Sequence, residues 1–185
     1  MIISISGVPG SGKTSVAKIL AERLGMNFYS MGGLRGKMAV ERGLTIDELN
    51  ALGEREAFTD NDVDDYQKKL GQIEDNFVIE GRLSWHFIPR SFKIFLTCDP
   101  HEAARRIYEA RRQTDDRTDE PAYQHVKATE EAVRKRVASD ALRYQKYYGL
   151  DVHDPSQYDL VLDTTSMKGP EETTEAILSK LPSAA

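Results

Sequence analysis

The stretch Gly7-Val8-Pro9-Gly10-Ser11-Gly12-Lys13-Thr14 decides the fold of this chain. It fits the pattern G-x-x-x-x-G-K-[ST]. The apolar run Ile2 to Ile5 precedes it, and apolar residues at helical spacing follow it, which predicts a strand, a glycine-rich loop and a helix. In that context the N–H groups of the loop and the positive end of the helix dipole hold polyphosphate.

The loop therefore predicts an ATP site in which Lys13 and Thr14 have specific roles. Lys13 is expected to reach the β- and γ-phosphates, and the hydroxyl of Thr14 is expected to bind Mg²⁺. The expected ATP-binding residues are Gly7, Val8, Pro9, Gly10, Ser11, Gly12, Lys13 and Thr14. The alternative interpretation is a glycine turn that only joins a strand to a helix. The four filled motif positions and the flanking strand and helix patterns argue against it.

The composition predicts one globular domain of 185 residues, with 39% apolar and 30% charged residues. No apolar run approaches the length of about 18 residues that crosses a bilayer, and the N-terminus lacks a signal-peptide pattern, so we expect a cytoplasmic protein without a membrane partner. The net charge of −5 argues against a broad nucleic-acid surface. The single cysteine, Cys98, excludes an internal disulfide. We expect a monomer.

Strands and helices are predicted to alternate along the chain. Short apolar runs predict strands at about 2–5, 27–29, 77–79, 92–96 and 158–162. Helices are predicted at about 13–24, 33–43, 46–57, 61–74, 100–112, 122–148 and 170–181, with Thr45 and Glu48 forming a capping box at the third. Alternation of this kind predicts a five-stranded parallel sheet covered on both faces, the three-layer α/β/α architecture of P-loop NTPases.

Ligands of such sheets bind beyond the carboxyl ends of the strands. The glycine loop, Ser30, Glu80-Gly81-Arg82, Asp99 and Asp163-Thr164 all follow strand ends, so we expect them at one edge of the sheet. The sequence lacks the Asn-Lys-x-Asp motif that reads guanine.

A second group of cations lies far along the chain, on the helix predicted at 122–148. Arg136, Asp140 and Arg143 occupy positions i, i+4 and i+7, which place them on one face of that helix. A solvated face is the ordinary interpretation of such arginines. Beside a phosphate loop, however, phosphoryl transfer needs cations around the migrating group and its acceptor.

With these motifs the chain resembles the nucleoside monophosphate kinases, and among them the compact archaeal type of cytidylate kinase. The resemblance rests on Gly7 to Thr14, Ser30-Met31-Gly32, Glu80-Gly81-Arg82-Leu83, Arg136-x-x-x-Asp140-x-x-Arg143 and Tyr148-Gly149-Leu150-Asp151. It implies a single kinase domain whose core spans 1–30, 76–110 and 137–185. A helical insert that binds the monophosphate is implied at about 31–75, and a lid at about 111–136.

The resemblance also implies roles for individual residues. Lys13, Arg82, Arg136 and Arg143 would be catalytic, and Glu80, where bacterial members carry Asp, would assist Thr14 at the Mg²⁺ ion through water. The acceptor would be bound by Ser30, Gly32, Arg35, Asp60, Glu80, Gly81, Arg82, Arg136, Asp140 and Arg143. Gly36 stands where the family often carries an arginine, so Arg35 is the candidate to replace it.

The expected reaction is transfer of a phosphoryl group from ATP to CMP or dCMP, giving CDP or dCDP. Another small acceptor (AMP, UMP or a non-nucleotide) is a first alternative, and an ATP-dependent switch or binding protein is a second. The acidic cluster Asp60, Asp62, Asp64 and Asp65 is interpreted as a solvated helix face. Its alternative is that Asp60 and Asp64, one turn apart, contact a polar edge of the acceptor. Trp85 is expected to pack in the core.

Overall fold

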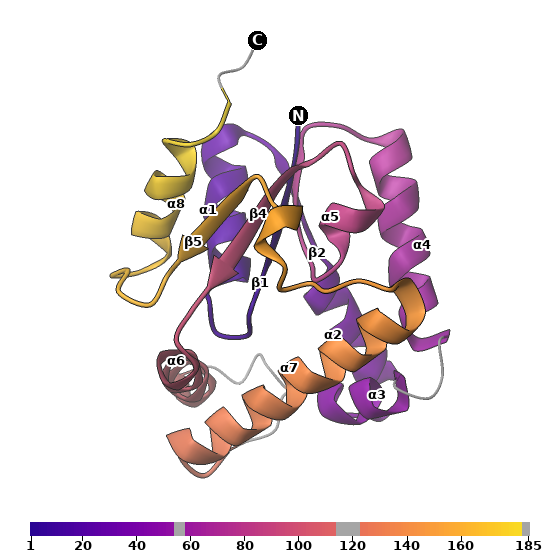
Figure 1. Cartoon of the computed structure of the whole chain (residues 1–185), viewed down its shortest axis with the longest axis vertical. Coiled ribbons are helices and arrows are strands. Elements are labelled where there is room, and N and C mark those ends of the chain that lie inside the picture. The colour runs from indigo at the N-terminus through magenta and orange to yellow at the C-terminus, as the bar shows by residue number, and fades with distance from the viewer. Residues whose placement is uncertain (54–57, 114–122, 183–185) are drawn as a thin grey trace.

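The computed structural model describes residues 1–53, 58–113 and 123–182, with the side chains of residues 58–60 outside the description (Figure 1). The strands are β1 (Ile2–Gly7), β2 (Asn27–Ser30), β3 (Phe77–Glu80), β4 (Phe92–Thr97) and β5 (Leu160–Asp163). The helices are α1 (Lys13–Leu24), α2 (Met31–Glu41), α3 (Ile46–Gly53), α4 (Phe58–Ile73), α5 (Ser84–Phe87), α6 (Pro100–Gln113), α7 (Val126–Tyr148), a 3₁₀ turn (Pro155–Gln157) and α8 (Pro170–Leu178).

The five strands form one sheet in the order β2-β3-β1-β4-β5, and every neighbouring pair is parallel. The predicted fold class, a parallel α/β/α sandwich of the P-loop type, is therefore confirmed. The strand order changes direction at β1, because β2 and β3 lie on one side of it and β4 and β5 on the other. Such a switch point opens a crevice beyond the carboxyl end of the strand, and the glycine loop lies at that point.

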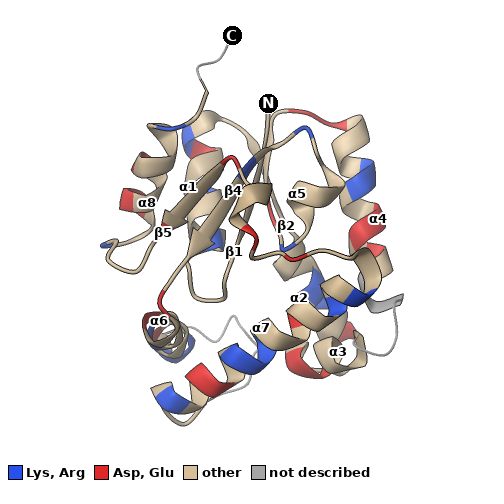
Figure 2. Ribbon diagram, in the orientation of Figure 1, with Lys and Arg blue, Asp and Glu red and all other residues tan. Residues whose placement is uncertain are grey.

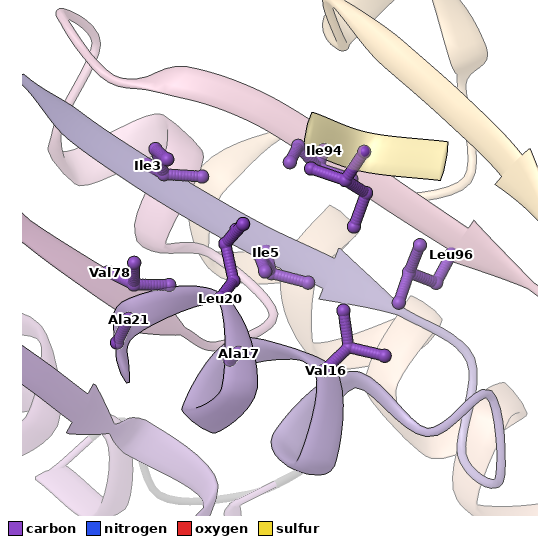
Figure 3. Packing of buried hydrophobic residues seen from close by; sticks show 10 residues of the cluster. Ile3, Ile5, Val16, Ala17, Leu20, Ala21, Val78, Ile94 and Leu96 are labelled. Atoms are coloured by element: carbon purple, nitrogen blue, oxygen red, sulfur yellow. The ribbon is translucent and has the colours of Figure 1, made fainter. Parts of the chain in front are cut away.

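The two faces of β1 pack differently, since successive side chains of a strand point to opposite sides. Ile3 and Ile5 face α1, where Val16, Ala17 and Leu20 cover them (Figure 3). On the opposite face Ile2 joins a cluster with Phe77 and Ile79, which is covered from α2 and α4 by Met31, Val63 and Leu70. Helices thus cover both faces of the sheet and leave its carboxyl edge for ligands.

Two buried serines of β1 are hydrogen-bonded on the second face, and one of them contacts the Arg82 segment. Ser4 Oγ lies 2.8 Å from Ser91 Oγ, and Ser6 Oγ donates to the carbonyl oxygen of Arg82 at 3.3 Å. Buried hydroxyls are costly unless they are hydrogen-bonded. These serines therefore interrupt the apolar run of β1 without loss, and Ser6 fixes the backbone of Arg82.

Helices α2 and α3 lie at the carboxyl edge of the sheet, and α4 runs from there along the side of the sheet (Figure 1). Ser30 caps α2 by accepting from the Gly33 amide at 2.9 Å. The capping box of α3 is confirmed, because the Thr45 amide donates to Glu48 at 2.7 Å and the Glu48 amide donates to Thr45 Oγ1 at 3.2 Å. The division of the chain into core, insert and lid stays a prediction.

Some element boundaries differ from the prediction. The long helix α7 begins at Val126 rather than 122, because the His125 ring caps it by accepting from the Ala128 amide at 3.1 Å. Strand β5 begins at Leu160, since a 3₁₀ turn occupies Pro155–Gln157, and α8 ends at Leu178 rather than 181. The short helix α5 was not predicted. Among the described residues, no helix is both long and apolar enough to cross a membrane.

Candidate active site

The loop between β1 and α1 is held by hydrogen bonds to its own backbone and to two neighbouring strands. The Val8 amide donates to Leu96 O at 3.1 Å, and Ser11 Oγ donates to Val8 O at 2.9 Å. Thr164, just after β5, donates from Oγ1 to Ser11 O at 3.2 Å. These bonds fix the loop before any ligand arrives, so little ordering entropy is lost when a phosphate binds.

Gly10 shows why the loop needs glycine. Its φ is 78°, and a Cβ at this position would lie 2.5 Å from the carbonyl oxygen of Ala103 in α6. Both the left-handed backbone and the contact with α6 therefore exclude a side chain. Gly12 also has a positive φ, of 84°, and directly precedes α1, so the first amides of the helix face the crevice.

A cavity of about 960 Å³ extends from this loop to the helices α2, α3 and α4. Pro9, Gly10, Gly12, Lys13 and Thr14 of the loop line it. Gly7, Val8 and Ser11, which were also predicted to surround the nucleotide, are absent from its wall, and two of them are buried behind it. The hydrogen bonds of Val8 and Ser11 hold the loop in shape, and contact of these three residues with the nucleotide stays a prediction.

Lys13 is half-buried at the start of α1, and its Nζ donates to Val8 O at 3.3 Å. Burial lowers its pKa to about 7, and the positive charges of Arg82 and Arg136 add to that effect, while Glu80 and Asp140 oppose it. An ammonium group with a lowered pKa next to two arginines is destabilised by its surroundings. An anionic ligand between these cations would remove that destabilisation.

The predicted cations from distant segments meet around Asp140. Arg82 Nε donates to Asp140 Oδ2 at 2.7 Å, and Arg82 Nη1 donates to the carbonyl oxygen of Gly7. Arg143 Nη2 donates to Asp140 Oδ1 at 2.5 Å. Both oxygens of this carboxylate thus hold arginines, one from the end of β3 and one from α7.

The charge of Asp140 is secured by these partners. Burial favours the neutral acid, but the guanidinium groups of Arg82, Arg143 and Arg136 outweigh it and hold the pKa of Asp140 well below its usual range. The resemblance had implied that Asp140 helps to bind the acceptor, and this stays a prediction. The contacts observed show that Asp140 orients two arginines at the edge of the sheet.

The other predicted acceptor residues lie mostly in the same wall. Ser30 Oγ donates to the carboxylate of Glu80, and Arg35 Nε donates to Asn50 Oδ1 at 3.1 Å. The predicted residues in the cavity wall are Ser30, Gly32, Arg35, Glu80, Gly81, Arg82, Arg136, Asp140 and Arg143. The side chain of Asp60 lies outside the described residues, as do residues 114–122 of the predicted lid. Figure 2 shows Lys and Arg positions on both α2 and α7, the helices that border this edge.

Several residues of the wall were not predicted. Arg106 of α6 donates from Nη2 to the carbonyl oxygens of Thr164 and Thr165 at 2.8 and 3.2 Å. Its Nε also donates to Glu102 at 2.8 Å, one turn earlier. In the sequence that i, i+4 pair has the pattern of an exposed salt bridge, which conceals the contact with the loop after β5.

The acidic cluster of α4 was interpreted as solvated, and for Asp64 that interpretation is wrong. Asp64 is only 5% exposed and lines the cavity, as do Gln67 and Asn50, which were not singled out. Asp62 and Asp65 are exposed as predicted. Trp85 packs as predicted, since it is 4% exposed and its Nε1 donates to Arg82 O at 3.0 Å.

Comparisons with known proteins identify the family. The model of the cytidylate kinase-like family matches residues 2–166. The cytidylate kinase of Methanocella arvoryzae is 39% identical over 165 residues, which cover 89% of this chain and 88% of that one. The cytidylate kinase of Archaeoglobus fulgidus is 35% identical over 179 residues, covering 96% and 93%.

Solved structures share the fold at low sequence identity. An uncharacterized protein from Eubacterium ventriosum matches with a TM-score of 0.70 and 21% identity over 100% of this chain and 99% of that one. A shikimate kinase from Acinetobacter baumannii matches with a TM-score of 0.60 and 17% identity over 98% and 95%. The chain belongs to the cytidylate kinase-like family, which confirms the expected class of enzyme, a nucleoside monophosphate kinase.

Proposed function

We propose that this protein transfers the γ-phosphoryl group of ATP to CMP or dCMP and releases ADP with CDP or dCDP. Family membership supports the class of reaction, and the names of the archaeal relatives support cytidylate as the acceptor. One observation carries the proposal: the glycine loop, the Arg82–Asp140–Arg143 cluster and the helices α2 to α4 line one continuous cavity. Two anionic ligands can thus meet inside it.

The triphosphate would lie in the loop, against the amides at the start of α1 and the ammonium group of Lys13. The acceptor phosphate would lie opposite, near Arg82 and Arg136. Its oxygen is already an anion at neutral pH, so the attack on the γ-phosphorus requires no general base. The protein then contributes alignment of the two phosphates and compensation of the charge that spreads during transfer.

Arg82 is suited to the acceptor phosphate because of how its guanidinium is held. Nε and Nη1 are engaged by Asp140 and Gly7, and within the described residues Nη2 makes no hydrogen bond. The side chain is 17% exposed. A guanidinium fixed at two of its nitrogens presents the third to a phosphate with little loss of entropy.

A Mg²⁺ ion fits the residues present. The hydroxyl of Thr14 is exposed at the mouth of the loop, and Glu80 lines the same cavity. No group of three or more His, Cys, Asp and Glu residues suited to a metal occurs in the described part of the chain. A nucleotide-borne Mg²⁺ would take its other ligands from phosphates and water. When bound, the ion would neutralise charge on the β- and γ-oxygens.

The test is ATP consumption across a panel of acceptors, with the nucleotide products separated and identified. We expect ATP consumption to depend on CMP or dCMP, and CDP or dCDP to accumulate in equal amount with ADP. Preference for AMP, UMP or a non-nucleotide acceptor would contradict cytidylate as the substrate but keep the kinase. ATP consumption that is indifferent to every acceptor would favour a switch and contradict the proposal.

A further inference from the structure

A second buried polar cluster lines the cavity, away from the phosphate-facing arginines. Asp64 and Gln67 stand one turn apart on α4, and they are 5% and 2% exposed. Both belong to the cavity wall. The apolar residues Val63, next to Asp64 in the chain, and Leu83, next to Ser84, line the wall as well. A carboxylate and an amide between apolar side chains form a site with few and directed polar contacts, as small-molecule sites do.

The cluster is attached to the Arg82 segment. Ser84, which follows Arg82 by two residues and is fully buried, donates from Oγ to Gln67 Oε1 at 2.9 Å. Two residues of chain span no more than about 7 Å. The amide of Gln67 is therefore tied to the chain segment whose guanidinium is proposed to hold the acceptor phosphate, and both Gln67 and Arg82 line the same cavity.

The hydrogen bonds fix which groups the cluster offers. An ionised carboxylate only accepts, so the amide nitrogen of Gln67 is the end that faces Asp64, with Nε2 3.4 Å from Oδ1. The oxygen of the amide is then the end that faces Ser84. Asp64 Oδ2 accepts from the hydroxyl of Tyr148, at the end of α7 beside α4 (Figure 1). The site thus presents a strong acceptor, Asp64, next to a donor, the second N–H of Gln67.

We infer that Asp64 and Gln67 read the base of the acceptor and select cytosine over uracil, an inference that rests on the proposed kinase function. The polar edge of cytosine carries an amino donor next to a ring-nitrogen acceptor. The amino group meets the carboxylate of Asp64, and the ring nitrogen accepts from Gln67. Uracil has the same shape but the opposite order, a carbonyl oxygen next to a ring N–H.

The penalty for uracil follows from this reversal. Its carbonyl oxygen would face the carboxylate of Asp64, and its ring N–H would face the amide N–H of Gln67. A site built to hydrogen-bond one pattern rejects an isostere that leaves its buried groups unpaired. We expect kcat/KM for CMP to exceed that for UMP by at least about tenfold. Adenine carries the same amino and ring-nitrogen order, so Asp64 does not by itself exclude AMP.

The experiment compares CMP with UMP in the wild-type protein, in Asp64→Asn and in the control Asp65→Asn. Asp65 is the next residue on α4, its side chain is 77% exposed, and its replacement removes the same charge outside the cavity. An asparagine at 64 can offer its N–H₂ to the carbonyl oxygen of uracil. We expect the ratio of kcat/KM for CMP over UMP to fall about tenfold to a hundredfold in Asp64→Asn. We expect it to be unchanged in Asp65→Asn, and the KM for ATP to be unchanged in both.

A purely structural role for Asp64, as the partner of Tyr148, makes a different prediction. Tyr148→Phe removes that hydrogen bond and leaves the carboxylate, so base reading predicts that the preference for CMP survives. Loss of the preference in Tyr148→Phe, or an unchanged ratio in a folded Asp64→Asn, would overturn the inference.

If Asp64→Asn does not fold, the inference is tested by comparing kcat/KM for CMP and UMP in the wild-type protein. Equal use of CMP and UMP by the wild type would overturn base reading and leave the kinase proposal intact. Failure of every nucleoside monophosphate to stimulate ATP consumption would instead refute the proposed function, and the inference with it.

Discussion

Binding of ATP is predicted to charge Lys13, and the proton that it takes up can be counted. The pKa of Lys13 is about 7 in the ligand-free site, chiefly because the group is buried. At pH 8.5 about 3% of the side chain is then protonated. A triphosphate placed against the amine favours the ammonium form. A return of the pKa toward its ordinary value of about 10.4 would protonate about 99%.

The predicted magnitude is therefore an uptake of about one proton per ATP bound at pH 8.5. The phosphates of ATP contribute little at this pH, since the last phosphate pKa is near 6. Isothermal calorimetry in two buffers of different ionisation enthalpy measures the uptake from the difference in apparent binding heat. The matched control is Lys13→Arg, because a guanidinium stays charged throughout and should take up no proton. Uptake near zero in the wild type, or equal uptake in Lys13→Arg, would refute the placement of this amine on the triphosphate.

Three further substitutions test the arginine cluster. Arg82→Ala should raise the KM for the acceptor much more than the KM for ATP in steady-state kinetics, and equal effects would remove Arg82 from the acceptor side. Arg136→Ala should lower kcat by up to about 10³-fold. The control Arg134→Ala, on the same helix but exposed and paired with Glu130, should keep a kcat near that of the wild type. Similar kcat values for the two variants would mean that the arginines of α7 only solvate the helix. Asp140→Asn should lower the free energy of unfolding in urea by about 3–5 kcal/mol, because it leaves buried guanidinium groups uncompensated. Since folding lowers the pKa of Asp140, the contribution of its charge to the free energy of unfolding is complete at neutral pH and is lost only as the pH falls below about 4. If Asp140→Asn lowered the free energy of unfolding by less than about 1 kcal/mol at pH 7, the ion cluster would be contradicted.

The strands of the sheet could be predicted from the sequence, because short apolar runs and the glycines between them reflect local chemistry. The loop from Gly7 to Thr14 predicted its own flanking strand and helix, and both are present. The predicted boundaries of helices and strands were wrong where a cap or a turn sets the end of the element. His125 is an unusual cap, and Tyr158, which was predicted to begin the last strand, instead closes the turn at Pro155–Gln157 by donating its amide to Pro155 O at 3.2 Å.

Site residues could be predicted from the sequence where they belong to a short motif, as Lys13 and Arg82 do. It was not predictable where burial depends on distant segments. Asp64 is one of several acidic residues in a polar helix, and its burial depends on distant residues such as Tyr148, 84 positions later. Arg106 was concealed in the same way, because its pairing with Glu102 looks complete within its own helix.

The central claim is that one cavity holds the triphosphate and the acceptor phosphate face to face. The most direct test is a crystal structure of this protein with adenosine and cytidine joined through five phosphates. We predict that the phosphate chain runs from the amides of Gly12 and Lys13 to the guanidinium of Arg82, with the cytosine against α4. A bound adenosine half whose phosphate chain turns away from Arg82 into solvent, with the cytidine half outside the cavity, would contradict the account.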